Sequence, residues 1–194
     1  MNPAAPRTRC SCSGRPYLVL GGALLACRAL GGKEIVVGVA GTGPDGLVSR
    51  SVAEAAMAEP ELNALVRVVE VPDRFVSGEG GALVSAVNGK LSHPPGRKRR
   101  ASDAGVDGLP TLLSNAETFA QLAVLAMLGP DGYASTGTTD EPGTVLLTVG
   151  GAVSRPAVVE VPSGIPLGVV LDICGARGGR WGPGRRLPRQ VAAA

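Results

Sequence analysis

Two short segments of the chain combine glycine with polar side chains in patterns suited to ligand binding. The first, FVSGEGGA (residues 75–82), places Gly78, Gly80 and Gly81 around Glu79. Glycine lets a ligand approach backbone N–H groups closely, and the carboxylate of Glu79 can stand at the mouth of a cleft. A glycine-rich corner that serves only close helix packing is the alternative. This segment alone leaves both interpretations open.

The second segment, GLPTLLSNAETFAQLAVLAML (residues 108–128), is a turn followed by an apolar run with helical periodicity. Polar residues crowd the expected start of this helix, at Ser114, Asn115, Glu117 and Thr118. Ser114 and Glu117 have the S-x-x-E spacing of a capping box, in which each side chain satisfies a backbone donor of the first turn. This local role leaves Asn115 and Thr118 as candidates for contacting a ligand.

A third motif, GTGPDG (residues 41–46), matches G-x-G-x-x-G between an expected strand and an expected helix. In a dinucleotide-binding fold such glycines admit a pyrophosphate, and Glu70 lies near the place of the ribose-binding acid. Pro44 argues against this interpretation, and glycine-rich turns are common in a chain with 29 Gly. The lone His93 lies beside two prolines and a basic run, which favours a surface position.

Cysteine spacing excludes the usual metal sites. Cys10 and Cys12 form C-x-C in an expected tail, and the sequence contains no C-x-x-C. We therefore expect free thiols, no metal site and a reducing, cytoplasmic compartment.

Charge and hydropathy exclude two further classes of protein. Twelve of the 19 basic residues lie in three clusters, which are near the N-terminus, at residues 97–100 and after residue 176. The rest of the chain has the other seven basic residues and all 16 acidic residues, so it is acidic. No aromatic residue is interleaved with the basic runs, and we expect no nucleic-acid binding. The apolar stretch before Arg28 is shorter than the roughly 20 residues of a spanning helix, so we expect no membrane insertion.

The elements that must position the candidate residues follow an α/β pattern. A helix, a strand, a helix and a strand in succession are typical of a βαβ unit with a parallel sheet, here at residues 17–30, 34–40, 45–58 and 64–71. A helix at 80–87, a long loop at 89–109 and a helix at 115–128 follow. We then expect a linker at 130–142, a β-hairpin in TVLLTVGGAVSRPAVVEVPSG and a short helix in IPLGVVLDICGA. Residues 1–14 and 177–194 lack periodicity and are expected to be unstructured.

Taken in order, these motifs resemble the FMN-binding flavoprotein subunit of NADH-quinone oxidoreductase, complex I. The family pattern reads approximately Y-x-C-G-E-E-T-A-L at the first segment and G-x-P-T-x-x-N-N-V-E-T-x-x at the second. It reads S-G-x-V-x-x-P-G-x-x-E-V-x-x-G-x-P-L at the expected hairpin. The resemblance extends over residues 15–176, and the ordered series is more specific than any one motif.

The resemblance implies an α/β architecture, with a partial, Rossmann-like flavin domain at residues 15–129 and a partial β-grasp domain of the soluble-ligand-binding (SLBB-like) type at 143–176. It implies FMN-dependent oxidation of NADH, electron delivery to iron–sulfur centres, and other subunits of such a complex as partners. A cytoplasmic location, peripheral to the inner face of the membrane, agrees with this role. The implied FMN-binding residues are Phe75, Gly78, Glu79, Gly80, Leu113, Ser114, Asn115 and Thr118.

Within that set the resemblance implies distinct roles. Glu79 and Asn115 would position FMN, the backbone from Gly78 to Gly81 would line the cleft, and Phe75 would flank the nicotinamide. No residue is assigned a catalytic role.

The chain also departs from the family pattern. Phe75 replaces a tyrosine, Gly80 replaces the second glutamate and Ser114 replaces the first asparagine. The family's G-R-G-G-x-G-F-P loop, its N-x-x-E-x-E-P segment and its C-x-x-C-x-x-C cluster domain have no match. We therefore expect a chain truncated or frameshifted at both ends, with FMN binding weakened or lost and no 4Fe-4S cluster. The alternative is a non-enzymatic β-grasp scaffold that binds a partner subunit or a small ligand.

Overall fold

The computed structural model describes residues 15–40, 47–72, 74–96 and 99–176. They form two compact units, the first ending at Ala123 and the second beginning at Val124. Each unit has a hydrophobic core of its own. The residues expected to be unstructured and the G-x-G-x-x-G motif at 41–46 lie outside the described residues.

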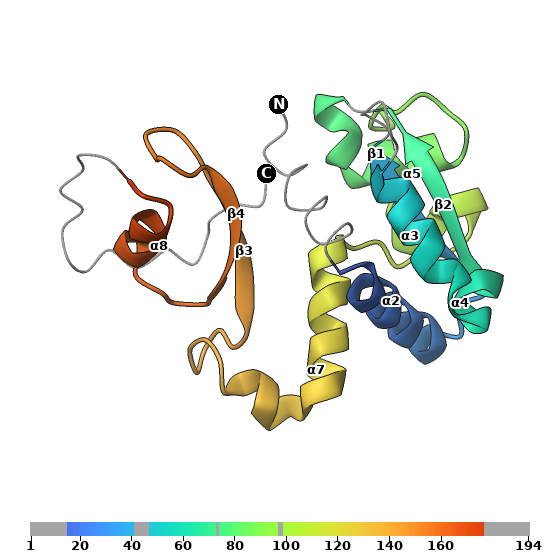
Figure 1. The fold of residues 1–194 in the computed structure, drawn as a ribbon. Helices are drawn as coiled ribbons and strands as arrows, with labels where there is room; N and C mark the ends of the chain where they lie inside the picture. Colours follow the sequence, from blue (N-terminus) through green and yellow to red (C-terminus); the bar gives the residue numbers. More distant parts are fainter. Residues whose placement is uncertain (1–14, 41–46, 73, 97–98, 177–194) are drawn as a thin grey trace. The chain divides into compact units, whose positions relative to one another are not determined.

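A parallel pair of strands forms the sheet of the first unit (Figure 1). Strand β1 (Ile35–Ala40) pairs with β2 (Val66–Val71), in a register that runs from Ile35 opposite Val66 to Ala40 opposite Val71. Helix α3 (Leu47–Met57) lies in the connection between them. Parallel neighbours need such a crossover, because the chain must return to the same end of the sheet. The α/β class and the parallel pairing predicted from the sequence are confirmed.

The connection also contains a second helix, α4 (Pro60–Leu65), which is too short to show a hydrophobic period in the sequence. Its first residue is a proline, which the first turn of a helix tolerates because that position has no intrahelical hydrogen bond to lose. The following strand therefore begins at Val66, and the prediction that it begins at Ala64 was wrong.

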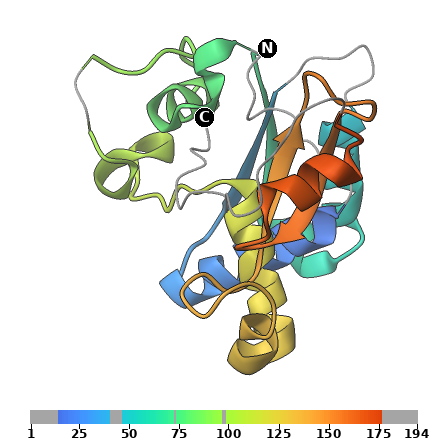
Figure 2. The same ribbon diagram turned by 90° about the vertical axis from the view of Figure 1, so that its left-hand side faces the viewer.

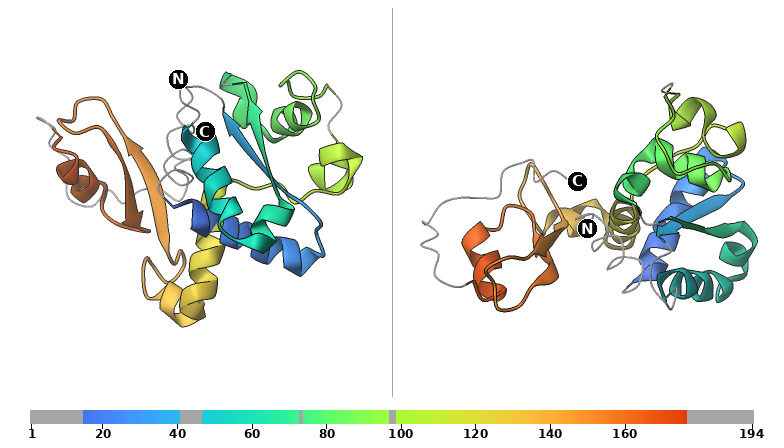
Figure 3. Two further views of the ribbon diagram at one scale, coloured as in Figure 1. Left: turned by 45° about the vertical axis from the view of Figure 1, so that its right-hand side comes forward. Right: turned by 90° about the horizontal axis from the view of Figure 1, so that it is seen from above.

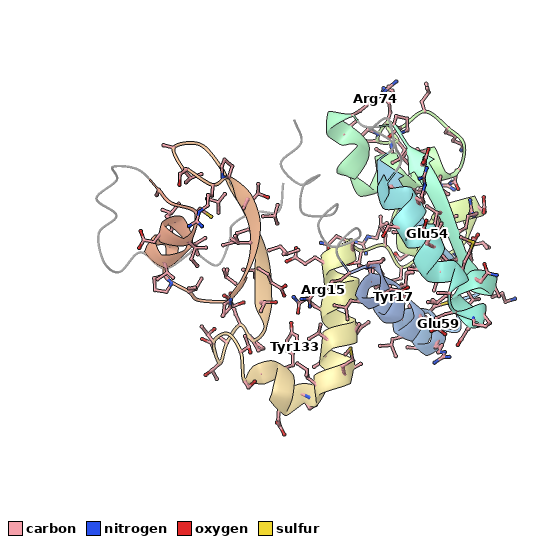
Figure 4. The ribbon with its side chains drawn as sticks, in the orientation of Figure 1. Arg15, Tyr17, Glu54, Glu59, Arg74 and Tyr133 are labelled. Atoms are coloured by element: carbon pink, nitrogen blue, oxygen red, sulfur yellow. The ribbon has the colours of Figure 1, made fainter. Side chains whose placement is uncertain are left out.

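The core of the first unit is made of aliphatic side chains from four elements. Helix α2 (Pro16–Leu30) contributes Leu20, which is completely buried, and α3 contributes Val52. Small and branched residues fill the remaining space, as a composition poor in aromatics requires: Val19, Ala23, Ile35, Ala55, Ala56 and Leu62. Carboxylates such as Glu54 and Glu59 lie exposed on the helical layer (Figure 4).

Residues 89–109 are partly helical, and the prediction of a loop without secondary structure was wrong. They contain α6 (Ala101–Ala104) and the 3₁₀ turn η2 (Val106–Gly108). Thr111 closes this segment: its Oγ1 accepts from Val106 N at 3.0 Å, and its backbone N–H donates to Ala101 O at 2.8 Å. These short turns have no long hydrophobic period, so the sequence pattern does not reveal them.

Two polar contacts fix η2 to the rest of the first unit. Asn88, at the end of α5 (Gly80–Val87), donates to Gly105 O at 3.1 Å and accepts from Asp107 N at 2.8 Å. Arg67 of β2 lies 2.6 Å from Glu34 and 3.5 Å from Asp107. The hydrogen bond that Arg67 donates to the carboxylate of Glu34 raises the pKa of Arg67, so this guanidinium stays charged.

Replacing Asn88 with alanine should loosen the turn at Val106–Gly108. Both hydrogen bonds of the side chain are lost, at a cost of about 1–2 kcal/mol in the free energy of unfolding. Hydrogen exchange at the Asp107 amide should accelerate, since its acceptor is removed. Asn88→Asp keeps that acceptor and should preserve most of the protection. Unchanged exchange at Asp107 in the alanine variant would show that Asn88 does not hold the turn.

The helix of the second candidate segment is longer than predicted. Helix α7 runs from Ala116 to Ala134 and passes through Gly129, whose φ of 72° marks a kink directly before Pro130. Proline removes a helical hydrogen bond, and glycine accepts the left-handed backbone that the kink requires. Residues 130–134, expected to lie in a linker, therefore continue the helical segment.

The second unit is an antiparallel hairpin with a short helix (Figure 2). Strands β3 (Thr144–Val149) and β4 (Ala157–Pro162) pair from Thr144 opposite Pro162 to Val149 opposite Ala157. Helix α8 (Leu167–Ile173) lies against the hairpin (Figure 3), with Val170 fully buried beside Leu147 and Val161. The predicted hairpin and helix are confirmed. No helix in the described parts of either unit is long and apolar enough to cross a membrane.

Candidate functional site

The first candidate segment forms a 3₁₀ turn that leads directly into a helix. Turn η1 covers Phe75–Gly78, and α5 begins at Gly80. Glu79 occupies the N-cap position between them, where its Oε2 accepts a hydrogen bond from Ala82 N at 2.8 Å. A carboxylate at this position satisfies a backbone donor and interacts favourably with the helix dipole. The carboxylate of Glu79 thus has a local role at the N-terminus of α5.

Side chains from two later segments cover the glycines at the start of α5. A Cβ atom on Gly80 would lie 2.8 Å from Leu113 Cδ2, and one on Gly81 would lie 2.8 Å from Pro95 Cδ. Both distances are too short for a carbon–carbon contact, so these glycines allow close packing. The same geometry brings Gly80 and Leu113, two residues of the predicted site, into contact. Neither Pro95 nor this packing was anticipated from the sequence, because contacts between distant segments leave no periodic signal.

The cap of α7 is one residue later than predicted. Asn115 directly precedes the first helical residue, Ala116, and its Oδ1 accepts from the backbone N–H of Thr118 at 2.7 Å. Thr118 Oγ1 donates to the same oxygen at 2.9 Å. Ser114 therefore lies outside the helix, and the predicted capping role of Ser114 was wrong. The S-x-x-E spacing suggested Ser114, but asparagine is an equally good N-cap residue and stands one position closer to the apolar run.

The orientation of the Asn115 carboxamide follows from its two partners. A backbone N–H can only donate, so the atom that accepts from Thr118 N must be the amide oxygen. The amide nitrogen, which only donates, is the other polar atom of the side chain. Asn115 is exposed. The start of α7 thus presents hydrogen-bond donors at its surface.

The other predicted site residues lie in η1, at the N-cap of α5 and directly before the cap of α7. Phe75 opens η1, but its side chain lies outside the described part of the chain. Gly78 and Glu79 are exposed at the end of the turn, and Ser114 is exposed directly before the cap of α7. The structure thus places the eight predicted residues on two segments of the first unit that touch through Leu113 and Gly80.

Two weaker sequence candidates do not join this group. Glu70 lies in β2 opposite Val39 and is exposed, while its partner in the dinucleotide interpretation, the G-x-G-x-x-G motif, lies outside the described residues. His93 is exposed, as predicted. Among the residues that the structure describes, no group of three or more His, Cys, Asp or Glu side chains is arranged to hold a metal ion.

Comparison with known proteins gives consistent matches. The family model described as the Nuo51 FMN-binding domain matches residues 1–124. The alpha subunit of the NAD-reducing hydrogenase HoxS of Cupriavidus necator is 32% identical over 136 residues, which is 70% of this chain. A subunit of the NADH-quinone oxidoreductase of Mycobacterium tuberculosis is 35% identical over 115 residues, or 57% of this chain.

A solved structure agrees with these relatives. The crystal structure of an NAD⁺-reducing [NiFe]-hydrogenase in the air-oxidized state matches 95% of this chain, with a TM-score of 0.79 and 26% sequence identity. The match covers 34% of that chain, and the matches to the two curated relatives cover 22% and 26% of their lengths. The region that matches this chain therefore makes up about a fifth to a third of the length of each of these proteins.

Proposed function

The chain belongs to the Nuo51 FMN-binding domain family, and from this premise we propose that it binds FMN at the surface formed by the η1–α5 turn and the start of α7. The observation that carries the proposal is the outward-facing NH2 group of Asn115, which can donate hydrogen bonds. Asn115 follows Leu113 by two residues in the sequence, and Leu113 packs on Gly80 at the turn. A flavin has carbonyl, ring-nitrogen and phosphate acceptors, so a fixed amide donor suits it.

The described residues fit a flavin better at some positions than at others. The carboxamide of Asn115 supplies donors, and the exposed Gly78 leaves the turn without a side chain at that point. The N-terminus of α5 fits the FMN phosphate less well, because the carboxylate of Glu79 already accepts from Ala82 N. Two anions at one helix end repel each other. We therefore propose that Asn115 meets an acceptor atom of FMN away from the N-terminus of α5.

We also propose that FMN is held weakly. Weak binding is supported by the carboxylate of Glu79 at the N-terminus of α5. It is also supported by the three departures from the family pattern, at Phe75, Gly80 and Ser114. At Gly80 the side chain of Leu113 lies where a larger residue would project. Hydrogen bonds to charged groups contribute roughly 1.5–3 kcal/mol each, so few such losses are needed to lower the affinity greatly.

The names of the relatives also support a proposal about the hydride donor and the partner subunits of this chain. We propose that NADH is the hydride donor to the bound flavin. We further propose that the chain acts with other subunits of an NADH-quinone oxidoreductase or an NAD-reducing hydrogenase, at the inner face of the membrane in the former case. When bound, FMN would supply two-electron acceptance from the nicotinamide and one-electron release to iron–sulfur centres.

A titration with flavin tests the proposal. Adding the purified chain to a fixed concentration of FMN should raise the fluorescence anisotropy of the flavin in a saturable manner. Riboflavin, titrated in parallel, measures what the phosphate contributes. A flat anisotropy curve for both flavins at protein concentrations up to the solubility limit would refute flavin binding by this chain.

A further inference from the structure

The hydroxyl and the backbone N–H of Thr118 both bind the amide oxygen of Asn115. We propose that Thr118 is a positioning residue: it fixes the Asn115 carboxamide so that only the NH2 group faces outward, and it acts on a ligand through Asn115. The expected effect on flavin affinity rests on the proposed function. The effect of Thr118 on the orientation of the Asn115 carboxamide can be tested without a ligand. It differs from the expectation from family resemblance, in which Thr118 contacts the flavin directly.

The hydrogen bonds at the start of α7 saturate the acceptor side of Asn115. Oδ1 lies 2.7 Å from Thr118 N and 2.9 Å from Thr118 Oγ1. A carbonyl oxygen has two lone pairs, and both are used here by one residue. The hydroxyl proton of Thr118 is directed at Asn115, since an amide oxygen can only accept.

This saturation determines what kind of ligand atom Asn115 can meet. The remaining polar atom, Nδ2, carries two hydrogens and no available lone pair, so it donates only. The group that it recognises must therefore be an acceptor: a carbonyl oxygen, an unprotonated ring nitrogen or an oxyanion. A hydroxyl or amino group that needs an acceptor finds none on this side chain. The pair Asn115–Thr118 thus selects for acceptors.

The surroundings of Thr118 support this assignment. Thr118 and Asn115 are both exposed, so packing in the core does not hold the carboxamide. A rotamer at an exposed position is otherwise free to exchange, and ordering such a side chain on binding costs affinity. A second hydrogen bond from the same helical turn lowers this cost before any ligand arrives.

Two variants of Thr118 separate positioning from simple capping. Thr118→Val removes the hydroxyl, keeps the branched shape and keeps the backbone N–H that Asn115 caps. Thr118→Ser keeps the hydroxyl and is the matched control. In the ligand-free protein, the side-chain amide resonances of Asn115 and its χ1-dependent three-bond couplings should move toward averaged values in the valine variant only.

Flavin affinity gives the second measurement. The dissociation constant for FMN should rise about three- to tenfold in Thr118→Val, the effect of one net hydrogen bond, and stay within about twofold in Thr118→Ser. Unchanged Asn115 resonances and couplings in ligand-free Thr118→Val would overturn the inference, even if FMN affinity falls, because Thr118 would then contact the flavin directly. If the unaltered chain shows no flavin binding, the proposed function fails, and the NMR comparison still decides whether Thr118 positions Asn115.

Discussion

Replacing Gly22 with alanine should destabilise the first unit by about 3 kcal/mol or more. A Cβ atom on Gly22 would overlap the carbonyl oxygen of Phe119 and lie 2.6 Å from its carbonyl carbon and 3.1 Å from its Cα. Gly22 is buried in α2, and Phe119 belongs to the first turns of α7. The two helices touch backbone to backbone at this point, so α7 must shift away to admit a methyl group.

The size of this destabilisation depends on the kind of atoms that the added methyl group would meet. Overpacking a core usually costs about 1–3 kcal/mol, because neighbouring side chains can change rotamer. Backbone atoms of a helix have no such freedom. Separation of α2 and α7 would also expose Ala116, Phe119 and Ala120, which pack against the core cluster. We therefore expect a cost at or above the top of the usual range.

The neighbouring glycine provides a matched control. A Cβ atom on Gly21 would meet only Ala123 Cβ at 3.9 Å, an ordinary van der Waals distance. Gly21→Ala should therefore be neutral or stabilise the chain by about 0.5–1 kcal/mol, because alanine favours the helix over glycine. Urea unfolding followed by circular dichroism compares the two variants directly. Equal midpoints would mean that α2 and α7 do not pack as closely as the structure shows.

Substitutions at Asn115 should separate helix capping from flavin binding. Asp and Ser are as good at the N-cap as Asn, since each can accept from the backbone N–H of Thr118. Neither has an NH2 group. Asn115→Asp and Asn115→Ser should therefore keep the stability of the chain within about 0.5 kcal/mol and yet weaken FMN binding about tenfold or more. Asp should have the larger effect, because its charge repels electron-rich acceptors.

Asn115→Ala completes this comparison. Alanine loses the cap as well as the donor, so the free energy of unfolding should fall by about 1 kcal/mol in addition to the loss of affinity. Flavin anisotropy gives the dissociation constants, and urea unfolding gives the stabilities. If Asn115→Asp binds FMN as tightly as the unaltered chain, Asn115 serves only as a cap and the flavin lies elsewhere.

Much of the fold could be predicted from local pattern. The apolar run at β1 and the β-branched run at β2, separated by an amphipathic helix, predicted a parallel pair. Alternation on both sides of GGAVSRPA predicted the hairpin. These elements are long enough for hydrophobic periodicity to identify them, so their existence followed from the sequence even where their ends differed by a few residues.

Short elements and caps were the places where prediction from the sequence was wrong. The segment at residues 60–65 is a short helix with a proline at its start, and residues 101–108 are held by Asn88, Thr111 and Arg67 rather than by a periodic core. At the start of α7 two adjacent polar residues, Ser114 and Asn115, are both suitable N-cap residues. The structure shows that Asn115 is the N-cap, one residue later than predicted.

The sequence by itself determined the order of the elements, the α/β class and the two segments that carry the candidate residues, because hydrophobic period and motif spacing are local properties of the chain. Only the tertiary structure decided what the glycines and polar residues do there. It placed Leu113 on Gly80 and the backbone of Phe119 on Gly22, and it turned the oxygen of Asn115 toward Thr118. The physical reason is that contact distances and hydrogen-bond directions depend on how helices pack in three dimensions, and residue types alone do not specify them.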